Sequence, residues 1–252
     1  MCDSCPSPER RQFLRQVAVL AAAMTVPGAA LASGGGVSGA AGKPTGAKSG
    51  SHAPPTQKVT PDEALARLLQ GNKRYVSNKA FHPNESPEAR AKLANGQAPF
   101  AAILGCADSR VPPEIVFDHG LGDIFVVRVA GNVVEDEGAG SLEYAVDHLG
   151  TPLIVVLGHE RCGAIKATIE TLEAGAEAPG RVASLVPKLK PAVEKTKGLP
   201  GDKAENAMRE NAKMMAAQIA SMEPILKEKV DQGKVKVVAM RYDLDTGAVE
   251  VL

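Results

Sequence analysis

Three side chains that bind soft metal ions stand in two short segments of the sequence, Cys106 in the first and His159 with Cys162 in the second. Two thiolates and one imidazole suit tetrahedral zinc, and three protein ligands leave a fourth position for water. His159 and Cys162 are three positions apart, close enough to chelate one ion. Cys106 comes much earlier, so only the fold could bring it to the same ion.

Other interpretations of these residues stay open at this point. Cys106 and Cys162 could form a disulfide, which an exported protein would permit. Cys162 with His159 could act as a thiolate nucleophile and its base, as in cysteine hydrolases, although Cys106 then has no role. Both cysteines could also be inert residues of the core.

The elements that must position these side chains follow an alternating pattern. Short apolar runs typical of buried parallel strands are separated by helical patterns, which predicts an α/β fold with a mainly parallel central sheet flanked by helices. Two earlier helices form an N-terminal helical arm, and part of a segment rich in Gly, Pro and Lys is expected to be a mobile loop. We expect strands at 100–105, 124–129, 153–158, 235–240 and 248–252, helices at 60–75, 87–95, 139–149, 161–174 and 203–231, and the loop within 175–202.

Both candidate ligand segments directly follow an expected strand. In open α/β sheets, ligands bind at the carboxyl ends of strands near a switch in strand order. Asp108 and Arg110 lie in the first of these segments, where a charge-assisted bond would keep the carboxylate ionised, or would form a simple loop salt bridge. Gly163 lies near the start of the expected helix at 161–174 and would let an anion approach the helix start, or would serve a tight turn.

The first 58 residues precede the expected domain. Arg10-Arg11, with Phe13-Leu14 behind them, resembles a bacterial twin-arginine signal, and a short apolar run and Ala30-Leu31-Ala32 follow. An ordinary secretory signal is the alternative. We therefore expect a signal peptide at 1–32, a flexible linker at 33–58 and one domain at 59–252, exported to the periplasm without a stable membrane anchor after cleavage. Because the twin-arginine route carries folded proteins, zinc loaded beforehand would shield both thiolates.

Composition excludes some classes of partner. The chain has 29 basic and 29 acidic residues, 3% aromatic residues and no Trp. Without a basic excess, nothing favours a nucleic acid or an anionic membrane surface as partner.

Two longer motifs contain the candidate residues. Cys-Ala-Asp-Ser-Arg-Val-Pro-Pro-Glu at 106–114, followed by His-Glu-Arg-Cys-Gly at 159–163, resembles the signature motifs of β-class carbonic anhydrases. The similarity covers about residues 60–252. It implies that Cys106, His159 and Cys162 bind one Zn²⁺ per subunit and that Asp108 and Arg110 form the catalytic dyad beside it. Glu160 departs from the small or hydroxyl residue more often found there.

The resemblance also implies an activity and an assembly. The activity is reversible hydration of CO2 to bicarbonate by zinc-bound hydroxide, with Asp108 as acceptor of the hydroxide's hydrogen bond, or as fourth zinc ligand in a closed state. The assembly is a homodimer or homotetramer. Relatives with the same motifs that hydrolyse CS2 or COS supply an alternative, and a non-catalytic zinc-binding module is another.

Overall fold

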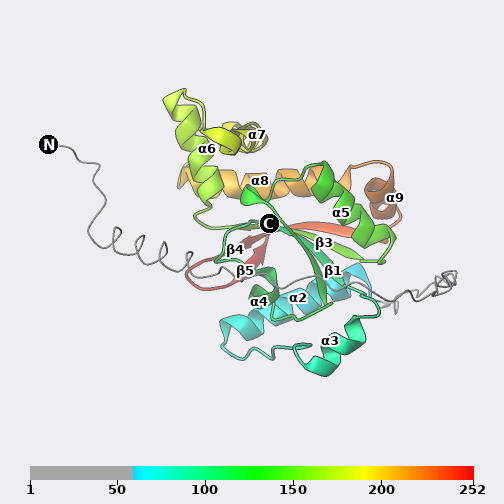
Figure 1. Ribbon diagram of the computed structural model, residues 1–252. Helices are drawn as coiled ribbons and strands as arrows, with labels where there is room; N and C mark the ends of the chain where they lie inside the picture. The colour runs from blue at the N-terminus through cyan, green and yellow to red at the C-terminus, as the bar shows by residue number, and fades with distance from the viewer. Residues whose placement is uncertain (1–58) are drawn as a thin grey trace, which may run out of the picture. The chain divides into compact units, whose positions relative to one another are not determined.

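The computed structural model describes residues 59–252, and one five-stranded sheet forms the centre of this domain (Figure 1). The expected signal peptide and linker lie outside the described residues. The first four strands are parallel and the last is antiparallel to its neighbour, which confirms the expected α/β fold. In the order β2-β1-β3-β4-β5, the strands are β1 (Ala101–Gly105), β2 (Ile124–Arg128), β3 (Leu153–His159), β4 (Lys236–Tyr242) and β5 (Val249–Val251).

The strand order reverses between β1 and β3. From β1 the chain crosses to β2 on one side, and later returns to β3 on the other side of β1. The register pairs Gly105, the last residue of β1, with Leu157 of β3 and Arg128 of β2. The carboxyl ends of β1 and β3 therefore lie side by side at the switch point, where open α/β sheets bind their ligands.

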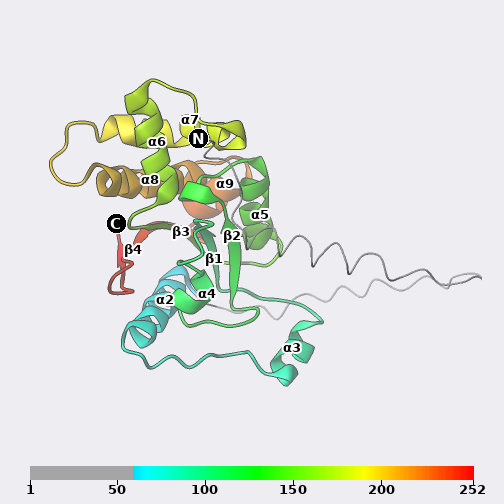
Figure 2. The same cartoon turned by 60° about the vertical axis from the view of Figure 1, so that its left-hand side comes forward.

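Alternate residues of the strands face opposite layers of helices. Ala102, Leu104, Ile154 and Val156 pack into one buried cluster, whereas neighbouring strand residues such as Ile103 pack into the other. Figures 1 and 2 show the two layers on opposite faces of the sheet. The first contains α5 (Asp136–Asp147), α6 (Gly163–Ala174), α7 (Val186–Lys195), α8 (Lys203–Ala220) and α9 (Ile225–Asp231), and the second contains α2 (Pro61–Val76), α3 (Pro87–Leu93) and α4 (Pro113–Val116).

Helix α2 begins where the sequence predicts. The Thr60 hydroxyl accepts a hydrogen bond from the Glu63 amide, and the Glu63 carboxylate accepts one from the Thr60 amide, which together form a capping box. Ala64 and Leu68 are buried beneath the sheet. The arm is therefore anchored to its own domain at its first turns.

One expectation about the second half of the chain is wrong. Residues 203–231 form two helices, α8 and α9, because Pro224 has no amide hydrogen to donate and disfavours helical geometry in the residue before it. Residues 175–202, where a loop was expected in part, also contain the 3-10 helix η2 (Gly180–Ser184) and α7, which buries Leu189 and Ala192 against the domain. Burial of this short apolar face stabilises α7, although Gly and Pro in the segment disfavour helix formation.

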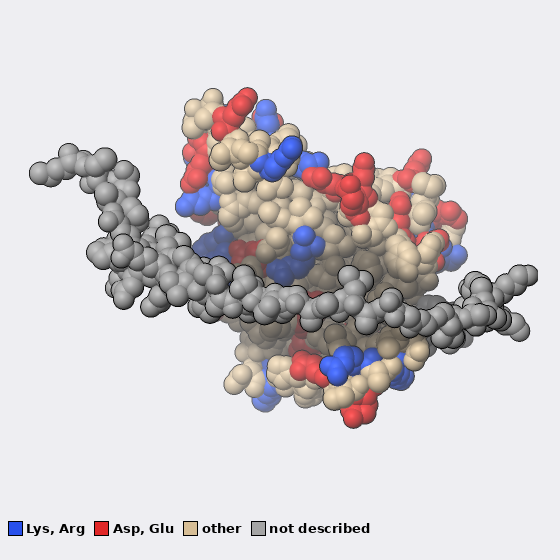
Figure 3. All heavy atoms as spheres, in the orientation of Figure 1, with Lys and Arg blue, Asp and Glu red and all other residues tan. Residues whose placement is uncertain are grey.

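Within residues 59–252, no helix combines the length and apolar character needed to cross a bilayer. On the face seen in Figure 3, acidic and basic side chains are interspersed.

Candidate metal centre

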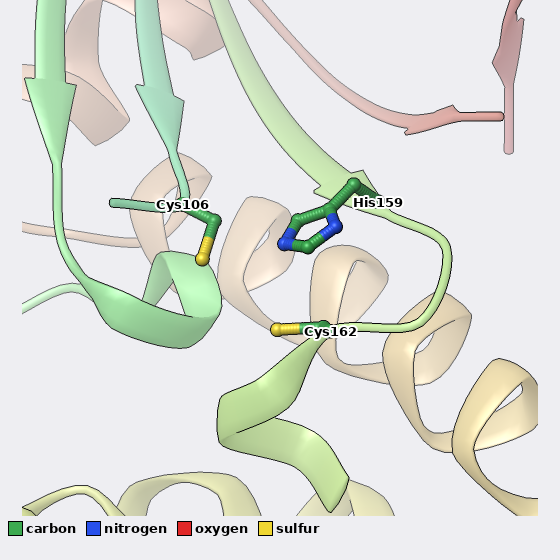
Figure 4. Close-up of side chains that lie close together, drawn as sticks. All are labelled: Cys106, His159 and Cys162. Atoms are coloured by element: carbon green, nitrogen blue, oxygen red, sulfur yellow. The ribbon is translucent and has the colours of Figure 1, made fainter. Parts of the chain in front are cut away.

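The three predicted ligands converge at the carboxyl ends of β1 and β3. Cys106 follows β1 directly, His159 is the last residue of β3, and Cys162 precedes the first residue of α6. Their side chains point toward one another in Figure 4, and their ligand atoms all lie within 4.8 Å of one another. All three are buried, with exposed fractions of 4%, 0% and 2%. The structure therefore brings together residues far apart in the sequence, as the strand-end argument predicts.

In the turn that carries His159 and Cys162, Arg161 is the residue with the unusual backbone conformation. Arg161 has a φ of 52°, in the left-handed region that most L-residues avoid. Gly163 does not have a positive φ, so the geometry of the turn does not require a glycine at this position. A Cβ added to Gly163 would meet nothing within 4 Å. The glycine thus leaves space at the N-terminus of α6.

One ring nitrogen of His159 is prepared as a ligand. Its Nδ1 lies 2.9 Å from the Glu160 carbonyl oxygen, which can only accept, so Nδ1 carries the proton and Nε2 the lone pair. Nε2 is buried and has no hydrogen-bond partner among the described residues. An unsatisfied buried lone pair is costly, and a metal ion between Nε2 and the two sulfurs would satisfy it.

The two sulfurs form a coupled pair. A hydrogen bond from the Cys162 thiol lowers the pKa of Cys106, and a hydrogen bond from the Gly131 amide acts in the same direction. The same interaction raises the pKa of Cys162. The Gly131 amide donates to Cys106 Sγ at 3.2 Å. Both cysteines are free thiols in the structure, so the donor set is that of a soft-metal site rather than of a disulfide.

Asp108 and Arg110 form a two-pronged ion pair at the edge of this cluster. Arg110 Nε donates to Asp108 Oδ1 at 2.9 Å, and a terminal nitrogen of Arg110 donates to Oδ2 at 2.7 Å. These bonds, together with one from the Arg110 amide, lower the pKa of Asp108 to about 2. Oδ2 lies 3.9 Å from His159 Nε2. The carboxylate is therefore ionised and held beside the candidate ligands.

Sequence reasoning missed the support that Arg128 gives to the first motif. Arg128 ends β2, and its Nε donates to the Cys106 carbonyl at 2.9 Å. A terminal nitrogen of the same guanidinium donates to the Asp108 carbonyl at 2.5 Å. The signal that the sequence did offer was a basic residue, Arg128, near the end of the expected strand at 124–129.

The carboxylate of Glu160 is engaged with the turn between β4 and β5. It accepts a hydrogen bond from the Leu244 amide at 3.2 Å and lies 3.6 Å from the Arg241 guanidinium and 3.5 Å from that of Arg161. These partners offset the negative charge of this unusual residue. Through these contacts, Glu160 connects the loop that carries His159 and Cys162 to the end of β4 and the turn that follows it.

Comparison with known proteins assigns the family. A family model described as "Carbonic anhydrase" matches residues 101–249. Carbonic anhydrase 2 of Mycobacterium tuberculosis is 40% identical over 189 residues, which cover 75% of this chain and 91% of that protein. The carbonic anhydrase of Mycolicibacterium smegmatis is 38% identical over 191 residues, covering 76% and 93%. The chain belongs to the carbonic anhydrase family.

Solved structures assign the class within the family. A Coccomyxa β-carbonic anhydrase in complex with acetazolamide matches with a TM-score of 0.56 and 29% identity, over 75% of this chain and 86% of that one. A tetrameric β-carbonic anhydrase of Sordaria macrospora has the same fold, with a TM-score of 0.60 and 24% identity, over 75% and 96% of the two chains. The fold and family are those of the β class.

Proposed function

We propose that Cys106, His159 and Cys162 hold one zinc ion in each subunit and that the protein catalyses the reversible hydration of CO2 to bicarbonate. The observation that carries the proposal is the unpartnered Nε2 of His159, buried between two free thiols within 4.8 Å. Three such ligands leave a fourth coordination position, as catalytic zinc sites do. The relatives named carbonic anhydrase support CO2 as substrate.

The chain's own residues would orient the reactants. Zinc, when bound, supplies Lewis acidity that lowers the pKa of water to about 7. The ionised Asp108 carboxylate would accept a hydrogen bond from a hydroxide at this site and so orient the hydroxide's lone pair toward CO2. Arg110 holds that carboxylate by two bonds, which keeps it from turning toward the ligands. The N-terminus of α6 at Gly163 has open space beside it and would favour an anionic product such as bicarbonate through its dipole.

The decisive experiment measures zinc and turnover on the same protein. Purified mature protein is expected to contain near-stoichiometric zinc and to hydrate CO2 in stopped-flow assays. Cys106→Ser is expected to lose both zinc and activity, because a hydroxyl is a poor zinc ligand. A Cys106→Ser protein that keeps both would contradict the ligand assignment.

The same experiment separates the alternatives. Full zinc without CO2 hydration at pH 8.5, where a site closed by Asp108 should be open, would exclude the proposed activity. Turnover of CS2 or COS would then identify the hydrolase alternative, and no turnover of any of the three would identify a non-catalytic zinc module.

We also propose that the protein is a homodimer or homotetramer. The β-carbonic anhydrase of Sordaria macrospora that shares this fold is tetrameric, which supports the proposal by analogy. Val76 at the end of α2 and Ile115 in α4 are large apolar side chains that are exposed, as they would be on a surface that meets a second subunit. The test is given with the whole-molecule argument below.

Finally, we propose that residues 1–32 direct export to the periplasm by the twin-arginine route. The support is the sequence alone, namely Arg10-Arg11 before the short apolar run. A reporter fused to residues 1–35 should be translocated, and the Lys-Lys replacement of the two arginines should abolish translocation. A fusion exported equally well by the Lys-Lys variant would instead indicate an ordinary secretory signal.

A further inference from the structure

Helix α8 packs directly against the backbone that carries the metal centre. Gly158 precedes His159 in β3, and a Cβ added to it would lie 2.7 Å from Met208 Sδ and 3.4 Å from Ala212 Cβ. The absence of a side chain at Gly158 therefore allows this close approach of α8. The face of α8 that carries Met208 and Ala212 therefore packs next to the strand residue that precedes His159.

Asn211 is the polar member of that buried face, with an exposed fraction of 1%. Its Nδ2 donates to the Gly131 carbonyl oxygen at 2.9 Å. Because a carbonyl only accepts, this contact fixes the amide group with its nitrogen toward Gly131. A buried asparagine that spans from one helix to a distant turn constrains that turn strongly.

The turn that Asn211 holds is also the one that contacts a ligand sulfur. The Gly131 amide donates to Cys106 Sγ at 3.2 Å. Gly131 has a φ of 74°, and an added Cβ would lie 3.0 Å from Leu189 and 3.3 Å from Ala164. Gly131 is thus closely packed at its Cα. Its carbonyl accepts a hydrogen bond from Asn211, and its amide donates one to the Cys106 sulfur.

We propose that Asn211 is a positioning residue for the metal centre: it fixes the Gly131 turn so that the Gly131 amide points at the Cys106 thiolate. An N–H···S bond draws charge from a thiolate and orients it, and partners of metal ligands typically change metal affinity by about 10- to 100-fold. The proposal rests on the proposed zinc site. It assigns a function to a residue outside both sequence motifs.

The chain offers a matched control in Asn72 of α2. Asn72 is also a buried helical asparagine, with an exposed fraction of 5%. Its Nδ2 donates to the carbonyls of Val116 and Gly247 at 3.0 and 2.8 Å, and its Oδ1 accepts from the Val249 amide at 2.9 Å. None of these bonds involves a metal-ligand residue. Its loss should therefore destabilise the fold without altering the metal centre.

The experiment compares Asn211→Leu and Asn72→Leu in the full-length holoprotein. Zinc affinity is measured by competition with a chelator, and the cobalt-substituted proteins are compared by their thiolate-to-cobalt charge-transfer bands. Asn211→Leu should bind zinc about 10- to 100-fold more weakly and shift those bands. Asn72→Leu should lower the melting temperature at least as much, yet keep wild-type affinity and bands.

Asn211→Ala is the second variant, to be used if Asn211→Leu fails to fold. The shorter side chain adds no bulk to the core, and its loss of the hydrogen bond to Gly131 should produce the same spectral shift. Wild-type affinity and bands in a folded Asn211 variant would overturn the proposal and leave Asn211 a packing residue only. Wild-type protein that binds neither zinc nor cobalt would instead overturn the proposed metal site itself, so the two failures are distinguishable.

Discussion

Asp108 shows how geometry rather than protonation decides the function of a residue at neutral pH. Its pKa is lowered to about 2, chiefly by the hydrogen bonds from Arg110. A lowered carboxylate pKa contributes stability that is fully present above the unfolded pKa of about 3.9 and is lost as the pH falls through about 2. At pH 7 the carboxylate is ionised with or without Arg110. The guanidinium is therefore needed to hold Asp108 in place.

Arg110→Ala should for this reason lower kcat/KM for CO2 hydration by roughly 100-fold at pH 7, the scale of loss for one preorganised hydrogen-bond donor. Without the two bonds, Asp108 is free to turn toward His159 Nε2, now 3.9 Å from its Oδ2. The pKa of Asp108 should rise toward its usual range, which a carboxyl titration by NMR would detect. Zinc content should stay unchanged.

Lys227→Ala is the control. Lys227 forms an exposed ion pair with Asp231 within α9, and 42% of its side chain is accessible. Exposed pairs of this kind contribute little stability. Lys227→Ala should keep kcat/KM within a few-fold. Equal losses in the two variants would show that the Asp108–Arg110 pair has no special function.

At the scale of single residues, the candidate metal ligands could be predicted from the sequence, whereas Asn211 could not. Cys106, His159 and Cys162 are identifiable because their side-chain chemistry is rare and each segment follows an apolar strand. Asn211 has common chemistry and lies 80 positions from its partner Gly131. Nothing local distinguishes it from a surface asparagine, so only the packing of α8 on the sheet reveals its contact.

At the scale of elements, the strands were predictable because burial on both faces leaves continuous apolar runs. The helices of the second half were less predictable, because their boundaries depend on single residues and on tertiary burial. Pro224 separates α8 from α9 within one helical pattern, and α7 forms despite Pro191 because Leu189 and Ala192 find a buried partner surface. Local propensity is a weak prior where packing is strong.

Element ends also explain why the site lies where it does. The carboxyl ends of β1, β2 and β3 supply Cys106, Arg128 and His159, and the parallel register places these ends at one edge of the sheet. Neighbouring helices then fix the turns that follow. The sheet thus determines which residues meet, and the helical layer that contains α8 determines how they are oriented.

At the scale of the whole molecule, the helical layer below the sheet leaves large apolar side chains exposed. Phe81 is 73% exposed and Ile115 57%. Both flank Asp118, which follows α4 and accepts hydrogen bonds from the Phe81 amide at 3.0 Å. Large apolar side chains exposed close together on one layer are suited to contact another subunit.

The double variant Phe81→Glu/Ile115→Glu should therefore weaken subunit association by roughly 100-fold, because each charge would have to be buried at the contact. Sedimentation velocity on the mature protein at several concentrations measures this shift toward monomer. Both side chains are exposed within one chain, so the melting temperature of the monomer should change little. Val182→Glu is the control, since Val182 is 46% exposed in η2, among the helices of the other layer. If the double variant and the wild type sediment alike while Val182→Glu dissociates, the interface lies on that opposite layer.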